Sequence, residues 1–288
     1  MERHTRSYLQ LMKPGITLSN TMTAVAGYFL AASIVGFELS ALLGVAAGVA
    51  LVIASACVVN NMIDRDLDVK MKRTKGREIA AGKISLVAAG IYAVVLGAAG
   101  FLSLIVWTNW LTVALGALAF VWYVVVYGIA KRTTPFSTII GGVCGALPPV
   151  AGYTAATGEM DMVAWVVFGL LMVWQLPHFY AISIFRRDDY KKAKLPVWSV
   201  RYSNASVKAQ ILFWVFVFAV LAPVLTIFGA TGFTYLIVMT GVSVYWLYQG
   251  ADSYDKLSEV EWARKMFRIS LVVLLTLSLM LAVGGYLP

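Results

Sequence analysis

The sequence predicts an all-α integral membrane protein that crosses the bilayer nine times. Of its 288 residues, 60% are hydrophobic and only 13% are charged, and the mean hydropathy is +0.81. Apolar stretches of about 20 residues, the length that spans a bilayer, recur along the whole chain. The 23 Lys and Arg lie outside these stretches or, in the case of Arg268, at the edge of one. We therefore expect the lipid bilayer to be the solvent of this protein.

Nine apolar stretches define the expected spans. Most of the connections between them are short, so consecutive spans are expected to pack as antiparallel neighbours. Glycine and other small residues are frequent inside them, as close helix packing in lipid requires. The expected spans are residues 15–35, 39–63, 86–106, 109–130, 136–156, 162–185, 209–229, 232–250 and 268–287.

The charge pattern supports nine crossings with a cytoplasmic N-terminus. On that topology the cytoplasmic side receives the N-terminal segment and residues 64–85, 131–135, 186–208 and 251–268, which together hold every Lys and Arg. The opposite side holds only Glu38, Glu159 and Asp161 as charged residues. This is the distribution of the positive-inside rule. The net charge of +9 then reflects topology and anionic lipid, and nucleic acid is not an expected partner.

Two long loops, residues 64–85 and 186–208, divide the chain. Each follows an even-numbered span, each carries seven Lys or Arg, and four spans separate them. This pattern suggests one domain, residues 1–288, built from two four-helix halves plus a ninth helix. The two loops would face one another over a shared cavity.

Asn60, Asp64 and Asp68 are spaced four residues apart where an apolar span meets the first loop. A helix that continued through this boundary would place them on one face, about 6 Å apart per step, and would turn Asp66 elsewhere. Carboxylates at the mouth of a membrane helix are costly unless they bind something, and hard oxygen ligands suit a Mg²⁺-chelated diphosphate. The alternative is a solvated, salt-bridged loop, but the amide pair Asn60-Asn61 in hydrocarbon needs partners and favours a functional site.

Cations in the two loops are the expected ligands of the diphosphate oxygens. The second loop has the higher net positive charge, because it contains fewer carboxylates than the first. It therefore has the character of a phosphate clamp. If that loop is helical, Arg186, Tyr190 and Lys194 share one face. The candidate diphosphate-binding residues are Lys72, Arg73, Arg77, Arg186, Lys191 and Lys194.

Polar groups also interrupt the sixth span. Trp174, Gln175 and His178 lie near Pro177, which frees a backbone carbonyl, and together they are consistent with a cavity wall that faces a substrate. The alternative for His178 is a structural hydrogen bond. Lys131-Arg132 is expected to anchor a helix end at the membrane interface. The aromatic residues within 107–127 fit an interfacial belt or a lipid-facing surface, with an apolar pocket for a planar substrate as the alternative for a minority of them.

The segments NNMIDRDLDVKMKRT, GGVCGALPPVAGY, WQLPHFYAI and DDYKKAKLPV resemble the UbiA-type intramembrane prenyltransferases, and the resemblance extends from Lys13 to Lys265. The first segment matches the superfamily signature N-x-x-x-D-x-x-x-D, and WQLPHF resembles the haem-farnesylating branch. Quinone-forming relatives carry a second Asp-rich motif on the sixth-helix loop. Here that stretch is RRDDYKKAK, with Arg186 and Tyr190 where those carboxylates fall, which leaves the number of Mg²⁺ ions open.

The resemblance implies a nine-helix bundle in the bacterial inner membrane with its active site on the cytoplasmic side. It also implies Mg²⁺-dependent transfer of farnesyl from farnesyl diphosphate to haem B, giving haem O, with transient contact to haem-handling or terminal oxidase proteins. Asn60, Asp64, Asp68 and Tyr190 would then act in catalysis, the first three as metal ligands, and Trp174, Gln175 and His178 would contact haem.

Two alternatives remain open at this point. One is an aromatic prenyltransferase of quinone biosynthesis. The absence of the second Asp-rich motif and the presence of WQLPHF disfavour it. The other is a transporter, which would place ionisable residues near the bilayer midplane. Here they gather at one edge of the spans, as an interfacial enzyme requires.

Overall fold

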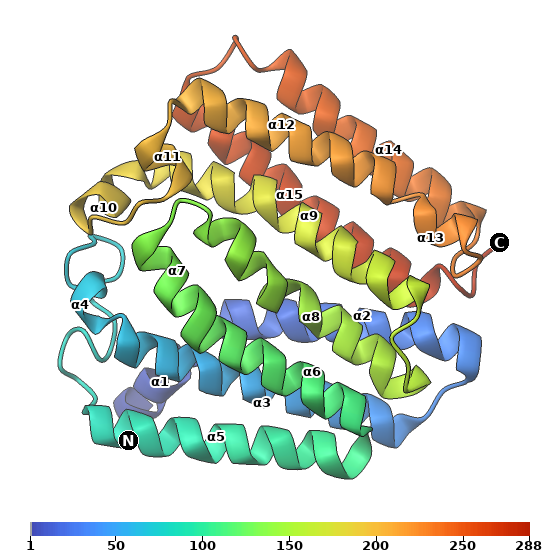
Figure 1. Cartoon of the computed structure of the whole chain (residues 1–288), viewed down its shortest axis with the longest axis horizontal. Coiled ribbons are helices and arrows are strands. Elements are labelled where there is room, and N and C mark those ends of the chain that lie inside the picture. Colours follow the sequence, from blue (N-terminus) through green and yellow to red (C-terminus); the bar gives the residue numbers. More distant parts are fainter. Residues whose placement is uncertain (1) are drawn as a thin grey trace.

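A computed structural model describes the backbone of residues 2–288 and the side chains from Arg6 onward. All regular elements in this described part are helices (Figure 1). They are α1 (Glu2–Leu11), α2 (Pro14–Val35), α3 (Leu39–Ile63), α4 (Arg65–Asp68), α5 (Leu86–Trp107), α6 (Trp110–Val121), the π-helix η1 (Trp122–Tyr127), α7 (Gly128–Thr133), α8 (Ser137–Thr157), α9 (Met162–Phe185), α10 (Arg187–Lys192), α11 (Trp198–Arg201), α12 (Asn204–Leu221), α13 (Val224–Ile227), α14 (Phe233–Asp252) and α15 (Glu259–Val283).

Eight helical stretches in residues 2–288 are long and apolar enough to cross a membrane. They are α2, α3, α5, the stretch from α6 through α7, α8, α9, the stretch from α12 through α13, and α15. The helix α14 has 20 residues but is not one of the eight, because Thr, Tyr, Ser and Gln interrupt its apolar sequence. The expected all-helical membrane fold is confirmed, whereas a ninth crossing and the orientation of the chain stay predictions.

Two helices begin earlier than their hydropathy predicts. The helix α12 begins at Asn204 rather than residue 209, and the Ser203 side chain accepts a hydrogen bond from its first turn. The helix α15 begins at Glu259 rather than residue 268, where Ser258 and Glu261 form a capping box. Hydropathy marks only the part of a helix that lies in lipid. Capped polar turns extend both helices beyond that part.

Close packing of α2 against α8 joins the two halves of the sequence. A side chain on Gly27 would place its Cβ 1.9 Å from the carbonyl oxygen of Pro149, and one on Gly152 would come within 1.8 Å of the carbonyl oxygen of Ala24. Only glycine lets the two backbones approach so closely. The helix α9 packs in turn against α8, α12 and α15.

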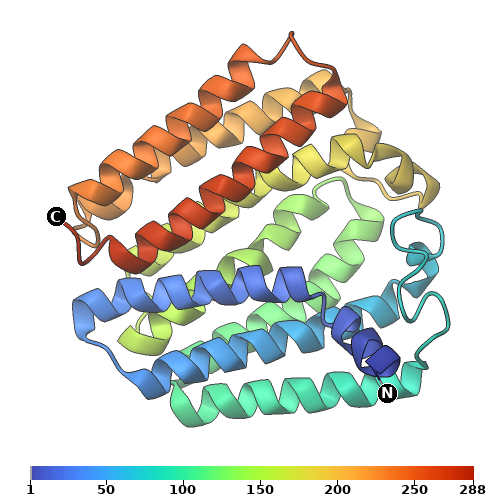
Figure 2. The ribbon, with the colours of Figure 1, turned by 180° about the vertical axis from the view of Figure 1, so that it is seen from behind.

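The last helix, α15, closes the bundle by packing on α2, α9 and α14. Figure 2 shows that α2 and α15 lie near each other at the end where the chain terminates and diverge toward the opposite end. The short helices α4, α10 and α11 gather at that opposite end (Figure 1).

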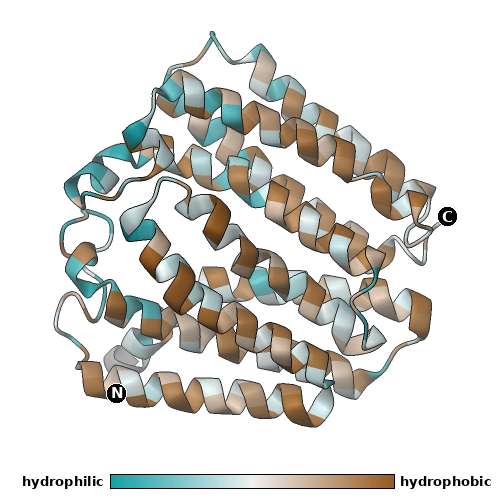
Figure 3. Ribbon diagram, in the orientation of Figure 1, coloured by the Kyte–Doolittle hydropathy of each residue, from teal (hydrophilic) through white to brown (hydrophobic). Residues whose placement is uncertain are grey.

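The surface separates into a polar end and an apolar flank. Figure 3 shows hydrophilic residues concentrated at the end that carries α4, α10 and α11. Along the flank, large apolar side chains are exposed, including Val87 at 74%, Trp110 at 76% and Ile227 at 77%. Such exposure is stable only where lipid replaces water around these side chains. The candidate functional residues therefore have to be sought at the polar end.

Candidate active site

Asn60, Asp64 and Asp68 lie at the polar end, where α3 gives way to α4. The helix ends at Ile63, and Asp64 has φ −89° and ψ 4°. Even so, the N–H of Asp64 donates to the carbonyl of Asn60 at 2.9 Å, and that of Asp68 to the carbonyl of Asp64 at 2.8 Å. The four-residue spacing therefore persists although the α-helix does not continue unbroken. Asn60 Nδ2 donates to Asp64 Oδ2 at 3.0 Å, and all three residues are buried.

Each of these buried groups is paired with a cation from another part of the chain. Arg77 donates to both carboxylate oxygens of Asp68, at 2.9 and 3.0 Å. Lys131 donates to Asp64 Oδ2, and Lys13 Nζ donates to the side-chain oxygen of Asn60 at 2.7 Å. A buried carboxylate without such a partner would be strongly destabilising. Arg77, expected to bind diphosphate, is here the ion-pair partner of Asp68.

Lys131 and Arg132 differ from the expected role of an interfacial anchor. Lys131 is buried beside Asp64, and Arg132 Nη2 lies 3.4 Å from Asp64 Oδ1. Sequence reasoning missed this because the contact joins residues 67 positions apart. The one available signal was that the short loop 131–135 and the loop 64–85 fall on the same side of the membrane by charge.

Lys13 is the second residue that sequence reasoning missed. It adopts the left-handed conformation, φ 50° and ψ 67°, immediately before Pro14, a backbone state uncommon for residues other than glycine. Loss of hydration in this half-buried position lowers the pKa of its ammonium group to about 8. Strained residues of this kind persist where the surrounding structure holds them and often mark functional sites.

Asp66 points away from the buried pair. Both of its carboxylate oxygens accept from Arg132, at 2.8 and 2.9 Å, and more than half of its side chain is exposed. The hydrogen bond from Arg132 lowers the pKa of the Asp66 carboxyl. Asp66 therefore takes up the exposed side of Arg132 and lies outside the buried cluster.

The two long loops touch each other. The backbone N–H of Lys72 donates to Asp189 Oδ1 at 3.1 Å. Beneath this contact, Leu67 and Met71 of the first loop pack with buried Ala193 and Leu195 of the second. This small apolar cluster brings the cations of both loops to the same end of the bundle.

Tyr190 lies half-buried against this loop cluster. Burial raises the pKa of its hydroxyl, while the positive charges of Arg73 and Arg186 oppose that shift. The N–H of Tyr190 donates to the carbonyl of Arg186 at 3.2 Å, so these two residues share a helical face as expected. Lys194 does not continue that face, because α10 ends at Lys192 and Lys194 has φ 56°.

The other expected diphosphate ligands are exposed to solvent: Lys72, Arg73, Arg186, Lys191 and Lys194. Among the described residues, no salt bridge within 4.0 Å involves any of them. Their ammonium and guanidinium groups are therefore available to an anion at this end of the bundle.

His178 and Trp174 face α15. His178 Nδ1 lies 2.7 Å from Ser270 Oγ, and Ser270 Oγ donates to the carbonyl of Phe267 at 2.6 Å. Because the hydroxyl of Ser270 uses its only proton in the bond to Phe267, its oxygen must accept from His178. Nδ1 of His178 is therefore protonated, and Nε2 carries the free lone pair. The indole of Trp174 stacks on the imidazole with 4.9 Å between ring centres.

Gln175 is not brought together with His178 and Trp174. Its Nε2 donates to the carbonyls of Gly142 at 3.1 Å and Leu171 at 2.8 Å, which fixes α9 to α8. The three expected haem contacts thus lie on two different faces of α9. The structural hydrogen bond considered for His178 is present, and the haem contacts stay a prediction.

Tyr123 and Tyr127 were expected in an interfacial belt, but they lie beside the acidic cluster. Both belong to η1, and their rings stack with 5.7 Å between centres. Lys131 Nζ, which pairs with Asp64, is 5.5 Å from the centre of the Tyr127 ring. The π-helix that carries them is a rare conformation that often occurs at functional sites. It places the face of Tyr127 near the ammonium group of Lys131, with Tyr123 stacked on Tyr127.

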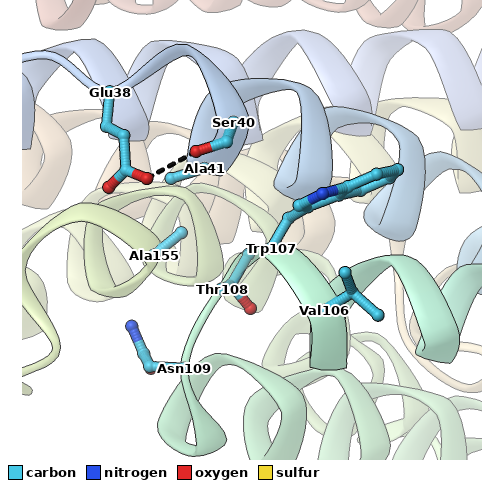
Figure 4. Close-up of a pocket in the computed structure, with 8 residues that line it drawn as sticks. All are labelled: Glu38, Ser40, Ala41, Val106, Trp107, Thr108, Asn109 and Ala155. Atoms are coloured by element: carbon cyan, nitrogen blue, oxygen red, sulfur yellow. Dashed lines mark hydrogen bonds between the residues drawn. The ribbon is translucent and has the colours of Figure 1, made fainter.

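A pocket of about 260 Å³ lies at the other end of the bundle, between the α2–α3 and α5–α6 connections. Figure 4 shows Glu38, Ser40, Trp107 and Asn109 around it. Its single carboxylate accepts from Ser40 at 2.5 Å, and its lining residues include no cation. It lacks the charges that a phosphorylated substrate would need, so the polar end remains the candidate active site.

Comparison with known proteins supports an assignment to one family. The model of the UbiA prenyltransferase family matches residues 20–272. A curated relative from Escherichia coli strain K12, named protoheme IX farnesyltransferase, is 41% identical over 284 residues, which cover 98% of this chain and 96% of the relative.

Two solved structures share the fold. One, described as digeranylgeranylglyceryl phosphate synthase in membranes, has a TM-score of 0.80, 19% identity and 99% coverage of both chains. The other is a UbiA homologue from Archaeoglobus fulgidus bound to GPP and Mg²⁺, with a TM-score of 0.67 and 15% identity, covering 96% of this chain and 99% of that one.

Proposed function

Because the chain belongs to the UbiA prenyltransferase family, we propose that it transfers a farnesyl group from farnesyl diphosphate to a vinyl group of haem B, giving haem O and diphosphate. One observation carries the proposal. Two buried carboxylates, Asp64 and Asp68, meet Arg77 of the same loop and Lys131 and Arg132 of α7 at the polar end of a membrane bundle. The 41% identity to a named protoheme IX farnesyltransferase supports haem as the acceptor.

The residues present fit a divalent cation. The donor set of Asp64, Asp68 and the Asn60 amide oxygen consists of hard oxygen ligands, which Mg²⁺ prefers. All three are buried, and their oxygens now accept from Lys131, Arg77 and Lys13. We propose that these three residues hold Mg²⁺, which when bound would neutralise charge on the diphosphate.

The cations of the site stabilise the leaving group. Ionisation breaks the bond between farnesyl C1 and the diphosphate oxygen, and the electron pair leaves with diphosphate. Exposed Arg73, Arg186 and Lys194 supply positive charge where this negative charge develops. Lys72 and Lys191 are further diphosphate ligands, and the hydroxyl of Tyr190, which is subject to the positive charges of Arg73 and Arg186, donates to a diphosphate oxygen.

The farnesyl C1 becomes an allylic cation, and the ring of Tyr127, beside the ammonium group of Lys131, attracts such a cation. The π electrons of a haem vinyl group then form the new carbon–carbon bond. Water adds to the resulting benzylic-type cation and loses a proton, which leaves a hydroxyl group.

The proposal also includes the topology that this chemistry needs. The helix α14 supplies a ninth crossing, the N-terminus is cytoplasmic, and residues 1–288 form one domain in the bacterial inner membrane. The polar end then faces the cytoplasm, where soluble farnesyl diphosphate is available. The charge distribution along the sequence supports this orientation. Haem-handling and terminal oxidase proteins are the proposed partners for supply of haem B and removal of haem O.

Product mass tests the proposed function. Purified protein in lipid vesicles receives Mg²⁺ and farnesyl diphosphate together with either haem B or 4-hydroxybenzoate. We expect a farnesyl- and water-containing haem with haem B and no prenylated product with 4-hydroxybenzoate. Prenylation of 4-hydroxybenzoate alone would assign the chain to quinone biosynthesis instead. Transfer to neither acceptor would refute the proposed function.

A further inference from the structure

A second charged feature at the polar end takes no part in the site described above. It is a groove of about 610 Å³ over the first turns of α15 and the end of α9, a volume in the range of small-molecule sites. Its lining residues are Phe185, Leu257, Glu261, Arg264, Lys265, Phe267 and Arg268. We refer to this feature as the α15 groove.

The α15 groove holds three cations, Arg264, Lys265 and Arg268, and a single carboxylate, that of Glu261. Among the described residues, no salt bridge within 4.0 Å involves Arg264, Lys265 or Arg268. The carboxylate of Glu261 is already engaged, since Ser258 Oγ donates to its Oε2 at 2.5 Å. Arg264 and Arg268 are one helical turn apart, so their Cβ atoms are about 6 Å from each other. Two guanidinium groups at that spacing suit two carboxylates on one edge of a ligand.

The apolar part of the groove is aromatic. The rings of Phe185 and Phe267 meet edge to face, with 5.7 Å between centres. Behind Phe267 lies the imidazole of His178 at 4.9 Å, and behind that the indole of Trp174. The wall of the groove is therefore the outer surface of a rigid aromatic stack, which favours a flat apolar ligand.

We propose that the α15 groove binds the carboxylate edge of the porphyrin acceptor, with Arg264 and Arg268 paired to its two propionates and the macrocycle against Phe185 and Phe267. The inference rests on the proposed function and adds the location of the acceptor. The first turns of α15, which line the groove, belong to the part of this helix that diverges from α2 (Figure 2). His178 then acts through Phe267 as a positioning residue and does not contact the propionates.

The test compares two acceptors in two proteins. Haem B has free propionates, whereas its dimethyl ester has the same ring without the charges. In the Arg264→Gln/Arg268→Gln double variant, the KM for haem B should rise about tenfold. This change corresponds to a loss of roughly 1.4 kcal/mol in binding free energy. The KM for farnesyl diphosphate should stay unchanged. The KM for the dimethyl ester should be equal in the two proteins. Arg201→Gln, which removes an exposed arginine from α11, serves as the charge control and should leave all three values unchanged.

A haem B KM equal in the double variant and the wild type would overturn the proposal, as would an equal rise for the dimethyl ester. Reduced binding of anionic lipid by the double variant, with the haem B KM unchanged, would assign the arginines to the membrane surface instead and would also overturn it. Binding of zinc protoporphyrin, followed by fluorescence, separates this result from failure of the proposed function. If the wild type binds that porphyrin more tightly than the double variant but transfers no farnesyl, the porphyrin site in the α15 groove is supported and the proposed reaction is refuted.

Discussion

The two long loops lie at the same end of the bundle, yet they handle charge in opposite ways. In the loop 64–85, Asp64 and Asp68 are buried and paired with Lys131 and Arg77. In the loop 186–208, the cations Arg186, Lys191 and Lys194 are exposed. Ion pairs with Lys131 and Arg132 tie the first loop to α7. The second loop is held against the first by the apolar cluster of Leu67, Met71, Ala193 and Leu195.

This difference separates two tasks that the proposed reaction needs. Buried carboxylates suit a metal ion, because a divalent cation can take the place of the ammonium and guanidinium groups that now pair with them. Exposed cations on a loop suit a charged substrate that must enter and leave. Substitutions of the buried Asp64 and Asp68 or their partners should therefore abolish turnover or destabilise the fold, whereas substitutions of the exposed cations should mainly weaken substrate binding.

The largest effect is expected for Asp64→Asn and Asp68→Asn. Each removes one charge from the donor set and keeps the shape of the side chain, so turnover should fall by about a thousandfold, the scale of losing one key electrostatic group. Haem O formation measured by mass and rate provides the test. Asp66→Asn is the matched control, because its carboxylate faces Arg132 outside the cluster, and it should retain most of the activity.

If Asp66→Asn lost as much activity as Asp64→Asn, the assignment of the buried pair would be wrong.

Lys131→Met should both slow turnover, by about a hundredfold, and lower the thermal unfolding temperature. The substitution leaves the buried Asp64 carboxylate with only Asn60 and a distant guanidinium of Arg132. Removing one partner of a buried ion pair is more destabilising than removing both. The double variant Asp64→Asn/Lys131→Met should therefore unfold at a higher temperature than Lys131→Met alone. An unfolding temperature of Lys131→Met equal to the wild type would show that the pair contributes nothing to the fold.

The helical period and the charge pattern were enough to predict much of the first loop. Four-residue spacing predicted that Asn60, Asp64 and Asp68 belong together, and the spacing persists across the end of α3. The spacing could not predict the partners of these residues. Lys13 and Lys131 lie far from them in the sequence and contact them only in the folded bundle. Local spacing reports neighbours on one helix, whereas ion pairs between helices depend on tertiary structure.

The ends of the helices show the same limit. Hydropathy located the apolar cores of α12 and α15 but not their capped polar turns, which begin at Asn204 and Glu259. For the second loop, the shared face of Arg186 and Tyr190 followed from helical spacing. The position of Lys194 did not, because α10 stops at Lys192 and a left-handed residue follows.

In the second loop, Lys194→Gln should raise the KM for farnesyl diphosphate by about three- to tenfold, because one exposed charge is worth roughly 1 kcal/mol. The unfolding temperature should stay within error of the wild type, in contrast to Lys131→Met. Steady-state kinetics at varied farnesyl diphosphate provides the measurement. A KM for farnesyl diphosphate equal to that of the wild type would show that Lys194 does not bind the diphosphate.

The smallest effect is expected for Tyr190→Phe, which removes a hydroxyl near Arg73 and Arg186 and keeps the ring in its apolar cluster. Turnover should fall by about fivefold, the scale of one hydrogen bond to a charged partner in a partly solvated site. Single-turnover rates with saturating substrates measure this directly. If turnover of Tyr190→Phe fell as far as that of Asp64→Asn, the two loops would contribute to the same step, and the assignment of separate roles to them would be wrong.

The central claim is that Asp64 and Asp68 bind the diphosphate of the donor through a divalent cation. Binding of farnesyl thiodiphosphate, which resists ionisation, to the protein in vesicles at increasing Mg²⁺ tests it most directly. The account predicts Mg²⁺-dependent binding by the wild type and by Asp66→Asn, and loss of the Mg²⁺ dependence in the Asp64→Asn/Asp68→Asn double variant. Binding by that double variant with the same affinity and the same Mg²⁺ dependence as the wild type would contradict it.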